Sequence, residues 1–351
     1  MFRRFTTSLP ERLAALLRRR PAGLVTLELV GPCNLRCSYC LRSESMLYGK
    51  AAFLSRERVL KILTAIQRQW APFSISLTGG EPTLHPEFGG IVADIARLGL
   101  PMRLVTNGSR FDKVADDLLG VRGNLRGVAF SLDGADREAH DRWRGAGSFD
   151  RVMKAMMTAR VKGLPFQVNV VLRRDTLPAM QPIVLLAARL GATGVDFGAL
   201  LPTTHRDFKT LSLSKAEEDE AAIEAVELSR MFRVQVRMVQ RLHKPEPGPH
   251  CLPLLERSLN VDHRGRLTLC GNLSFFRNGE CEGEVAGPAD SETRTRLETL
   301  RVFGQQALAD RDAALRTCEE EKSGPDEVLS SPCLSCLKHF GKIPWAREAT
   351  A

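Results

Sequence analysis

The sequence predicts an α/β protein of six β/α units, arranged as a partial barrel or an open sheet, followed by a small α+β module. Apolar and amphipathic segments alternate six times between residues 24 and 205. Glycine and polar residues follow several of the apolar segments, as at the strand ends where α/β proteins build their sites. A Pro/Gly-rich stretch at 244–250 then marks a boundary. A closed barrel would need two further units, about eight in all, so a partial barrel or an open sheet is expected.

Six segments are predicted to be strands because they are rich in Val, Ile, Leu and Phe on both faces, as in a parallel sheet covered on both sides. They are residues 24–30, 74–78, 102–106, 127–132, 166–171 and 195–200. The amphipathic segments between them predict helices. These are residues 55–70, 86–98, 110–120, 149–162 and 178–190. Residues 214–240 predict a charged helix that runs into a short strand.

The C-terminal part predicts a smaller module. Residues 258–270 have the pattern of a hairpin with a glycine turn at Gly265. A helix around 290–312 and a short cysteine-bearing tail complete this module. We therefore expect a basic N-terminal segment (1–22), a core (23–205), a connecting helix and linker (206–250) and a C-terminal module (251–345).

The composition is that of a globular protein, with 351 residues of which 43% are hydrophobic and 26% charged. Disordered, collagen-like and disulfide-rich miniprotein classes are thereby excluded. No apolar stretch approaches about 18 residues, so we expect no membrane-spanning helix. Arginines interrupt the N-terminal apolar runs, which excludes a signal peptide and predicts a cytoplasmic location. In a reducing compartment, clustered cysteines are metal ligands or catalytic groups more often than disulfides.

The chain is moderately basic, with a net charge of +9. Part of this charge comes from six arginines of the N-terminal segment: Arg3, Arg4, Arg12, Arg18, Arg19 and Arg20. They form either a docking surface for an acidic partner or one side of a solvated amphipathic helix. No aromatic residues interleave with the arginines as they would in a stacking platform, so a nucleic-acid partner is not favoured.

Three cysteines, Cys33, Cys37 and Cys40, directly follow the first predicted strand. Three thiolates within eight residues can hold one face of an iron–sulfur cluster, and they leave one iron open to a non-protein ligand. A structural zinc site is the alternative. However, zinc pairs normally have a second cysteine pair or histidines nearby, and no histidine precedes His85. Ligand number and spacing therefore favour iron–sulfur.

The spacing Cys-x3-Cys-x2-Cys, with Tyr39 before the last cysteine, resembles the signature of the radical S-adenosylmethionine (SAM) superfamily. The resemblance implies a partial (β/α)6 barrel of the radical SAM type. It also implies a [4Fe–4S] cluster on Cys33, Cys37 and Cys40 whose open iron is chelated by SAM. In that family one electron cleaves SAM, and the resulting 5′-deoxyadenosyl radical abstracts hydrogen from a substrate. An electron donor of the flavodoxin or ferredoxin type is implied as a partner.

The loop after the second predicted strand reads Gly79-Gly80-Glu81-Pro82. Glycines let backbone atoms approach a ligand, and a carboxylate can accept hydrogen bonds from an ammonium group. This loop matches the GGEP motif of the family, which the resemblance implies holds the SAM amino group. Asn107, in Thr-Asn-Gly after the next strand, matches a position at the edge of the site.

Residues 131–150 resemble a segment of the radical SAM maturases that modify sulfatases and peptides. The resemblance implies that Ser131 contacts the SAM ribose or carboxylate and that Arg144 pairs with the carboxylate. Arg142 lies close enough in sequence to be the alternative, because either guanidinium can pair with a carboxylate through two hydrogen bonds. Leu201 matches a position that lines the adenine, although core packing explains a leucine there equally well.

The spacing from Cys251 through Gly265 to Cys270 resembles the opening of SPASM and twitch domains, which carry auxiliary iron–sulfur clusters. A full SPASM domain continues with a longer cysteine run, whereas at its end this chain has only the pair Cys333 and Cys336. The resemblance therefore implies the twitch form, with one auxiliary [4Fe–4S] cluster on Cys251, Cys270, Cys333 and Cys336. Four thiolates leave no open iron, which suits electron transfer. Zinc on the same four cysteines is the alternative.

Four further residues receive a weaker interpretation. Cys281 and Cys318 are either inert buried thiols or hydrogen-atom donors to a substrate radical. His140 and Asp141 are expected to brace their loop rather than to act as acid and base.

The parts together predict oxidation or crosslinking of a peptide or of a small biosynthetic substrate, because an auxiliary cluster can accept the electron left on an oxidised substrate. The alternatives are a radical epimerase with a cysteine hydrogen donor, a nucleic-acid-modifying enzyme, and a protein that only carries electrons.

Overall fold

The computed structural model describes most of the predicted barrel and part of the C-terminal module. The described residues are 23–40, 53–69, 73–200, 208–243, 258–273, 280–284, 291–320 and 331–340. Leu201, Cys251 and the basic N-terminal segment lie outside this set, so the predictions made for them have no structural counterpart here.

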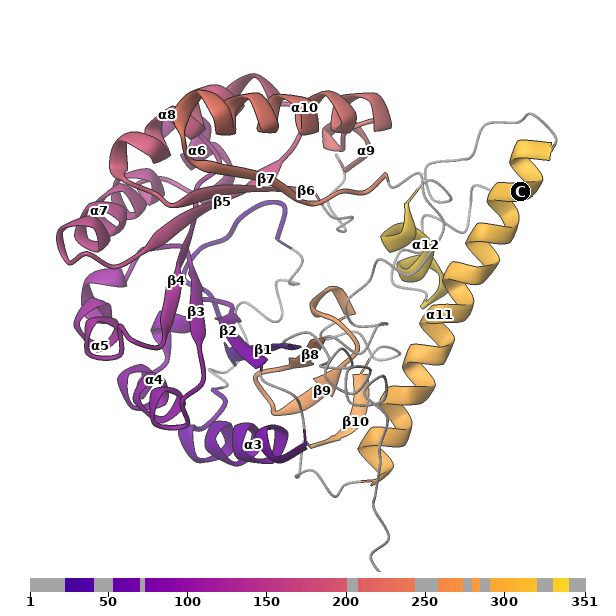
Figure 1. The fold of residues 1–351 in the computed structure, drawn as a ribbon, viewed down its shortest axis with the longest axis horizontal. Helices are drawn as coiled ribbons and strands as arrows, with labels where there is room; N and C mark the ends of the chain where they lie inside the picture. Colours follow the sequence, from indigo (N-terminus) through magenta and orange to yellow (C-terminus); the bar gives the residue numbers. More distant parts are fainter. Residues whose placement is uncertain are drawn as a thin grey trace, which may run out of the picture.

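The described strands form one ten-stranded sheet whose central part is parallel and follows chain order. The parallel strands are β1 (Gly23–Val30), β2 (Phe73–Gly79), β3 (Met102–Thr106), β4 (Leu125–Ser131), β5 (Phe166–Leu172), β6 (Gly194–Ala199) and β7 (Gln235–Gln240). Three strands extend the other edge: β8 (Ser258–Val261), β9 (Arg266–Thr268) and β10 (Glu280–Glu284). The sheet curves without closing, because β7 and β10 are its two edges (Figure 1). The predicted partial barrel is confirmed.

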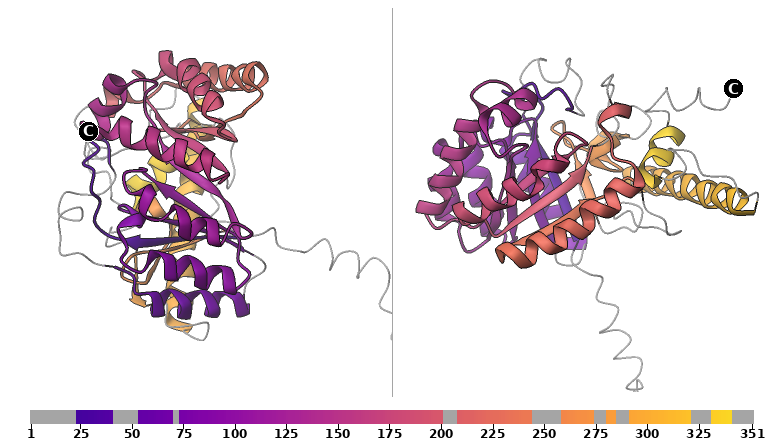
Figure 2. Two further views of the ribbon diagram at one scale, coloured as in Figure 1. Left: turned by 90° about the vertical axis from the view of Figure 1, so that its left-hand side faces the viewer. Right: turned by 90° about the horizontal axis from the view of Figure 1, so that it is seen from above.

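Helices cover the convex side of the sheet (Figures 1 and 2). They are α3 (Arg56–Gln69), α4 (Phe88–Arg97), α5 (Ala115–Gly120), α7 (Ser148–Val161), α8 (Met180–Leu190) and α10 (Lys215–Phe232). The other helices are α6 (Arg137–Arg144), α9 (Phe208–Leu211), α11 (Ser291–Glu320) and α12 (Pro332–His339), and the short 3-10 turns are Pro82–Leu84, Phe111–Lys113, Leu177–Ala179 and Gly271–Leu273. Across the described part of the chain, no helix is both long and apolar enough to cross a membrane.

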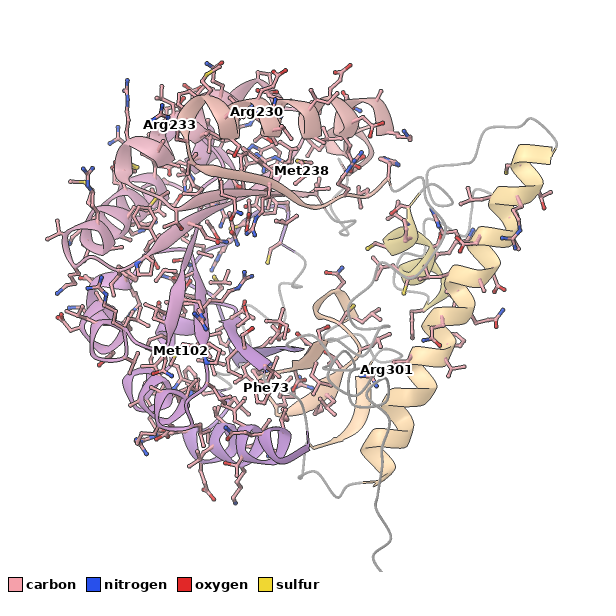
Figure 3. The ribbon with its side chains drawn as sticks, viewed as in Figure 1. Phe73, Met102, Arg230, Arg233, Met238 and Arg301 are labelled. Atoms are coloured by element: carbon pink, nitrogen blue, oxygen red, sulfur yellow. The ribbon has the colours of Figure 1, made fainter. Side chains whose placement is uncertain are left out.

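The expectation that the strands are buried on both faces holds for β6 and the second half of β1, which have runs of four buried residues, and is corrected for β3 and β5, in which buried and half-buried residues alternate. In β5, Phe166, Val168 and Val170 are buried in the core, whereas Gln167 and Asn169 between them are half-buried. Side chains project from both faces of the curved sheet (Figure 3). The concave face has no covering layer of helices because the barrel is open, so it accepts polar residues. The period-two alternation of these residues was already visible in the sequence.

Three short elements, helix α6, strand β7 and helix α12, differ from what the sequence pattern predicted. Residues 137–144 form helix α6, whose N-terminus is capped by Asp136 accepting a hydrogen bond from the backbone N of Ala139 at 2.8 Å. The strand predicted after the charged helix pairs parallel with β6, so the segment 206–250 contributes β7 to the barrel sheet. The cysteine-bearing tail is helix α12. These are short segments in which tertiary packing outweighs the sequence pattern.

The predicted hairpin is confirmed and extends the barrel. Gly265 has a φ of +78°, which the turn between β8 and β9 requires. Strand β8 pairs parallel with β1, with Leu24 opposite Ser258. A Cβ on Gly31 would lie 3.0 Å from Nε2 of His263 in the hairpin. The C-terminal module is therefore packed against the beginning of the cysteine loop.

Candidate active site

The cysteine loop, residues 31–40, follows β1 at the carboxyl edge of the parallel sheet. The backbone N of Cys40 donates to the carbonyl of Cys37 at 3.0 Å, and the backbone N of Leu35 donates to Sγ of Cys33 at 3.4 Å. The thiols of Cys33, Cys37 and Cys40 are half-buried and none forms a disulfide. They are close enough for charges on Cys37 and Cys40 to act on Cys33.

Burial controls the protonation of these thiols. It raises the pKa of Cys33 to about 12, against the hydrogen bond from Leu35. Burial also raises the pKa of Cys37, and the nearby Arg144 opposes this rise. Metal ligation requires thiolates, so loading a cluster here releases protons.

The loop after β2 lies directly against the cysteine loop. The backbone N of Gly80 donates to the carbonyl of Val30 at 2.7 Å, and the backbone N of Glu81 donates to the carbonyl of Pro32 at 3.0 Å. A Cβ on Gly80 would lie 1.8 Å from the carbonyl oxygen of Pro32. Only glycine allows this approach, so the two predicted ligand-binding loops form one unit.

The carboxylate of Glu81 joins the loops after β2 and β3. Its Oε1 accepts from the hydroxyls of Thr83 at 2.6 Å and Thr106 at 2.7 Å, and its Oε2 accepts from the backbone N of Asn107 at 2.8 Å. Burial raises the pKa of Glu81, although these hydrogen bonds oppose the rise. Oε2 keeps acceptor capacity for one further donor. The predicted contact to the SAM amino group would use this capacity.

Asn107 lies beside the first cysteine. Its Nδ2 is 3.8 Å from Sγ of Cys33 and donates to Oδ1 of Asn34 at 3.0 Å. Hydrogen bonds to ligating sulfurs tune the potential of iron–sulfur clusters. The structure thus places Asn107 at the edge of the cysteine loop.

Of the two candidate arginines, only Arg144 lies at the cysteine loop. Its Nε donates to Oδ2 of Asp133 at 2.5 Å, and its Nη1 is 4.0 Å from Sγ of Cys37. Burial would lower the pKa of Arg144, but Asp133 outweighs burial and raises it. Arg142 is exposed and lies over the ring of Trp143.

Asp133 holds this region together, and the sequence analysis gave it no role. Its Oδ1 accepts from the backbone N of Val171 at 2.9 Å, and its Oδ2 accepts from the hydroxyl of Tyr39 as well as from Arg144. Burial would raise the pKa of Asp133, but Arg144 and Arg173 outweigh it and lower this pKa. The signal in the sequence was an aspartate directly after the end of the predicted strand 127–132.

His140 and Asp141 brace the loop, as expected. Nδ1 of His140 accepts from the backbone N of Asp133 at 3.1 Å. Asp141 accepts from the backbone N of Gly147 at 2.6 Å and of Phe149 at 2.8 Å. Both side chains are therefore used in holding the segment after β4.

Burial of His140 predicts a pH-dependent stability. Burial lowers its pKa to about 4, whereas an unfolded histidine titrates near about 6.5. Below about pH 6.5 the unfolded chain takes up a proton that the folded chain does not, so stability falls between about pH 6.5 and pH 4. Urea unfolding of the apoprotein should show a loss of about 2 kcal/mol from this group between about pH 7 and pH 5. His140→Asn should lack this component, and an equal loss in both proteins would contradict the assignment.

The remaining predicted residues are spread over other elements. Ser131 is the last residue of β4, half-buried and opposite Asn169 of β5. Cys281 lies in β10, and Cys318 lies in the last turn of α11. The structure brings neither of them into the contacts described for the cysteine loop.

The C-terminal cysteines lie at the edge of the barrel. Cys270 follows β9, and Cys333 and Cys336 are in α12. Cys270 and Cys336 are both half-buried against the main hydrophobic core. Helix α11 contacts both β9 and α12, so it connects the two segments that carry these cysteines.

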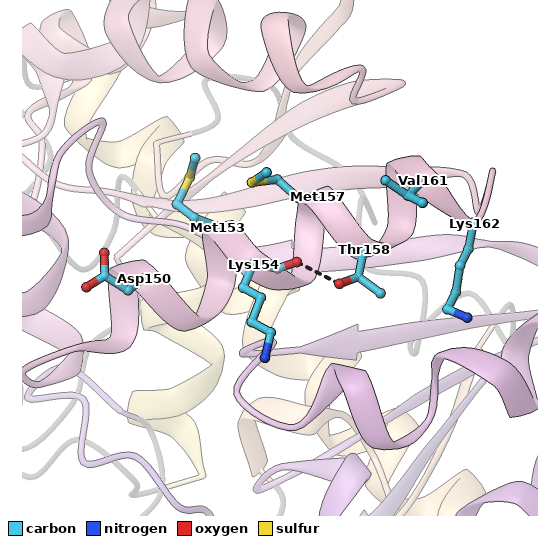
Figure 4. Close-up of a pocket in the computed structure, with 7 residues that line it drawn as sticks. All are labelled: Asp150, Met153, Lys154, Met157, Thr158, Val161 and Lys162. Atoms are coloured by element: carbon cyan, nitrogen blue, oxygen red, sulfur yellow. Dashed lines mark hydrogen bonds between the residues drawn. The ribbon is translucent and has the colours of Figure 1, made fainter.

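A groove of about 530 Å³ on the outer side of α7 is separate from this site. It is lined by Met153, Met157 and Val161, with Lys154 and Lys162 at its margin (Figure 4). Its lining residues come from α7 and from Lys162, which directly follows this helix, and none of them is a residue of the loops described above.

Known proteins are similar to this chain in sequence and in fold. Residues 28–187 match the Radical SAM superfamily. The chain is 32% identical over 172 residues to mycofactocin maturase MftC of Mycobacterium tuberculosis, covering 48% of this chain and 42% of that protein. It is 28% identical over 215 residues to the AdoMet-dependent heme synthase of Methanosarcina barkeri, covering 61% of this chain and 60% of that protein. The chain thus spans about half the length of these curated relatives.

The fold is also that of a solved structure, native anSMEcpe with bound AdoMet and Kp18Cys peptide. The TM-score is 0.63 at 15% identity, and the match covers 93% of this chain and 98% of that chain. The likeness at this identity concerns the fold. The family match includes the cysteine loop and strands β2 to β5, so residues 28–187 of this chain have the sequence features of the radical SAM superfamily, whose members bind a [4Fe–4S] cluster and SAM.

Proposed function

We propose that this protein is a radical SAM oxidoreductase that oxidises or cross-links a peptide, with a second iron–sulfur cluster in its C-terminal module. The observation that carries the proposal is that Cys270 and α12, with Cys333 and Cys336, belong to a module that continues the barrel sheet through β8. The name of the mycofactocin maturase relative and the peptide in the anSMEcpe structure support a peptide substrate. A small biosynthetic substrate is the runner-up, supported by the name of the heme synthase relative.

Cys33, Cys37 and Cys40 would hold the SAM-binding cluster. The cluster and SAM, when bound, supply a 5′-deoxyadenosyl radical that removes a hydrogen atom from the substrate. Gly80 has no side chain, which allows the loop after β2 to contact the cysteine loop directly. A ligand bound beside these two loops would therefore contact the backbone of Gly80. Arg144 uses Nε for Asp133, and its terminal nitrogens would pair with the SAM carboxylate.

Cys251, Cys270, Cys333 and Cys336 would hold the auxiliary [4Fe–4S] cluster of a twitch-like module. Removal of a hydrogen atom leaves a substrate radical, and loss of one further electron and a proton completes a two-electron oxidation. A cluster with four thiolate ligands has no open iron and suits the role of electron acceptor. Structural zinc on these residues would not accept an electron, because Zn²⁺ has no redox chemistry.

Iron analysis of a variant without the first cluster tests this proposal. We expect the triple variant Cys33→Ala, Cys37→Ala, Cys40→Ala to retain about four irons and four sulfides per chain after anaerobic reconstitution, as one [4Fe–4S] cluster holds. Adding Cys333→Ala and Cys336→Ala should remove them. Iron near zero in the triple variant, or zinc in its place, would contradict the auxiliary cluster and favour redox-neutral chemistry such as epimerisation.

A further inference from the structure

Arg173 is a fully buried charged side chain to which the proposed chemistry gives no role. It directly follows β5 at the carboxyl edge of the sheet, and its side chain is 0% exposed. Its Nε donates to Oδ1 of Asp175 at 2.9 Å, and its Nη1 donates to the carbonyl of Val171 at 3.3 Å. Its buried Nη2 has no hydrogen-bond partner among the residues that the structure describes. Buried guanidinium groups normally have all their donors satisfied, so this position needs an explanation.

Aromatic rings surround the guanidinium. Its Cζ is 4.1 Å from the centroid of the Trp143 ring and 5.2 Å from that of Tyr39. Cζ of Arg144 is 5.6 Å from the same Tyr39 ring. Cation–π attraction is strongest when the cation is desolvated, so these rings hold the charge of Arg173 in place. Tyr39 lies between Cys37 and Cys40 in sequence, so two guanidinium groups are close to the cysteine loop.

Asp175 accepts hydrogen bonds from both Arg173 and Trp143 and so holds the two side chains together. Its Oδ2 accepts from Nε1 of Trp143 at 2.8 Å, while its Oδ1 accepts from Arg173. The backbone carbonyl of Trp143 accepts from the backbone N of Ser38, inside the cysteine loop, at 3.2 Å. Arg173, Asp175 and Trp143 therefore form a closed unit that is hydrogen-bonded to the cysteine loop.

The charged side chains of this region differ in how deeply they and their counterions are buried. Asp133 and Arg144 form a buried pair with side-chain exposures of 0% and 9%. Arg173 is equally buried, but its counterion Asp175 is 30% exposed and therefore better screened by solvent. On the Tyr39 side of the cysteine loop, the innermost groups Asp133, Arg144 and Arg173 thus carry one positive charge in excess, whereas the buried carboxylate of Glu81 lies on the Cys33 side.

We propose that Arg173 is a positioning residue that holds a buried positive charge beside the cysteine loop and thereby favours one-electron reduction of the cluster bound there. The inference rests on the proposed cluster at Cys33, Cys37 and Cys40. The electron comes from an external one-electron donor of the flavodoxin or ferredoxin class, and no bond forms or breaks in this step. A positive charge in a medium of low dielectric stabilises the added electron.

The test compares Arg173→Met, which removes the charge, with Arg173→Lys, which keeps it. Arg103→Met is the matched control, because Arg103 is a partly buried arginine near the beginning of β3, away from the cysteine loop. Iron and sulfide are counted first. The midpoint potential is then measured by a redox titration followed by electron paramagnetic resonance, using the signal that changes when SAM is added.

We expect Arg173→Met to lower the ratio of reduced to oxidised cluster at a fixed potential about tenfold, a shift of about 59 mV to more negative potential for one electron. Arg173→Lys and Arg103→Met should remain close to the unmodified protein. If Arg173→Lys shifts as far as Arg173→Met, or if neither shifts, the inference is wrong although the cluster assignment stands. An unmodified protein without iron on the cysteine loop would instead overturn the proposed function.

Asp175→Asn is a second variant that does not depend on how well the core accepts a methionine. It removes the partly exposed counterion of Arg173 and keeps the size of the side chain, so the midpoint potential should move to a more positive value. A negative shift, or none, would contradict the role given to the charge of Arg173.

Discussion

Cys37→Ala should abolish the cleavage of SAM by the reduced, reconstituted protein. In the proposed site three thiolates would hold the cluster, and removing one would leave two protein ligands for four irons. We expect the release of 5′-deoxyadenosine to fall at least about 10³-fold, which corresponds to about 4 kcal/mol of lost transition-state stabilisation. The product is measured by liquid chromatography under anaerobic conditions.

The fold should survive this substitution. Cys37 is half-buried in a loop and belongs to none of the described strands and helices. The far-ultraviolet circular dichroism spectrum should therefore be unchanged. Cys318→Ala is the matched control, because Cys318 lies in the last turn of α11 and outside both predicted ligand sets; it should cleave SAM normally in the absence of substrate. Undiminished cleavage by Cys37→Ala would overturn the assignment of the first cluster.

The sequence was sufficient for the elements that repeat a strong pattern. Strands β1 to β6 and helices α3, α4, α5, α7 and α8 have apolar or amphipathic runs, and their predicted bounds differ from the structure by a few residues. The cysteine loop and the Gly80 turn were found because their spacing in the sequence is short. Hairpin β8–β9 was predicted because a glycine stands at its turn, and Gly265 adopts the positive φ that such a turn needs.

Contacts between distant segments could not be predicted in the same way. Asp133 joins Tyr39, Arg144 and Val171, which come from three different segments of the chain. The sequence contains each of these residues but not their proximity, which depends on the curvature of the sheet. Arg173 resembles an ordinary surface arginine in the sequence, and only its burial shows that it belongs to the site.

The sequence left Arg142 and Arg144 as alternatives, and the structure shows that Arg144 lies beside the cysteine loop. Helix α6 is eight residues long, and its last residue, Arg144, is directed to Asp133 and Cys37. Arg142 lies two residues earlier, which is about 200° around a helix of 3.6 residues per turn, and it is exposed. Once residues 137–144 are known to be helical, this geometry explains why Arg144 and not Arg142 faces Asp133.

Gly80→Ala should disrupt the site more than any other single-methyl addition to its loops. The new Cβ would lie 1.8 Å from the carbonyl oxygen of Pro32 and 2.5 Å from that of Gly31. These are backbone atoms of the cysteine loop, so the two loops must separate. Overpacking of this kind costs about 1–3 kcal/mol or more. We expect a lower melting temperature together with a loss of SAM cleavage of about 10²-fold, since a displacement of about 1 Å has this effect on catalysis.

Gly120→Ala is the control for adding a methyl group to a glycine. Gly120 is the last residue of α5, and a Cβ there would meet nothing within 4 Å. The substitution should leave SAM cleavage unchanged and leave the melting temperature the same or slightly higher, because alanine restricts the unfolded chain by about 0.4–1 kcal/mol. If Gly80→Ala behaved like Gly120→Ala, the two loops would tolerate separation, and the close approach of Gly80 to Pro32 would have no part in binding SAM. A loss of cleavage confined to Gly80→Ala, with iron content retained, would instead show that the distance between the loops positions the ligand.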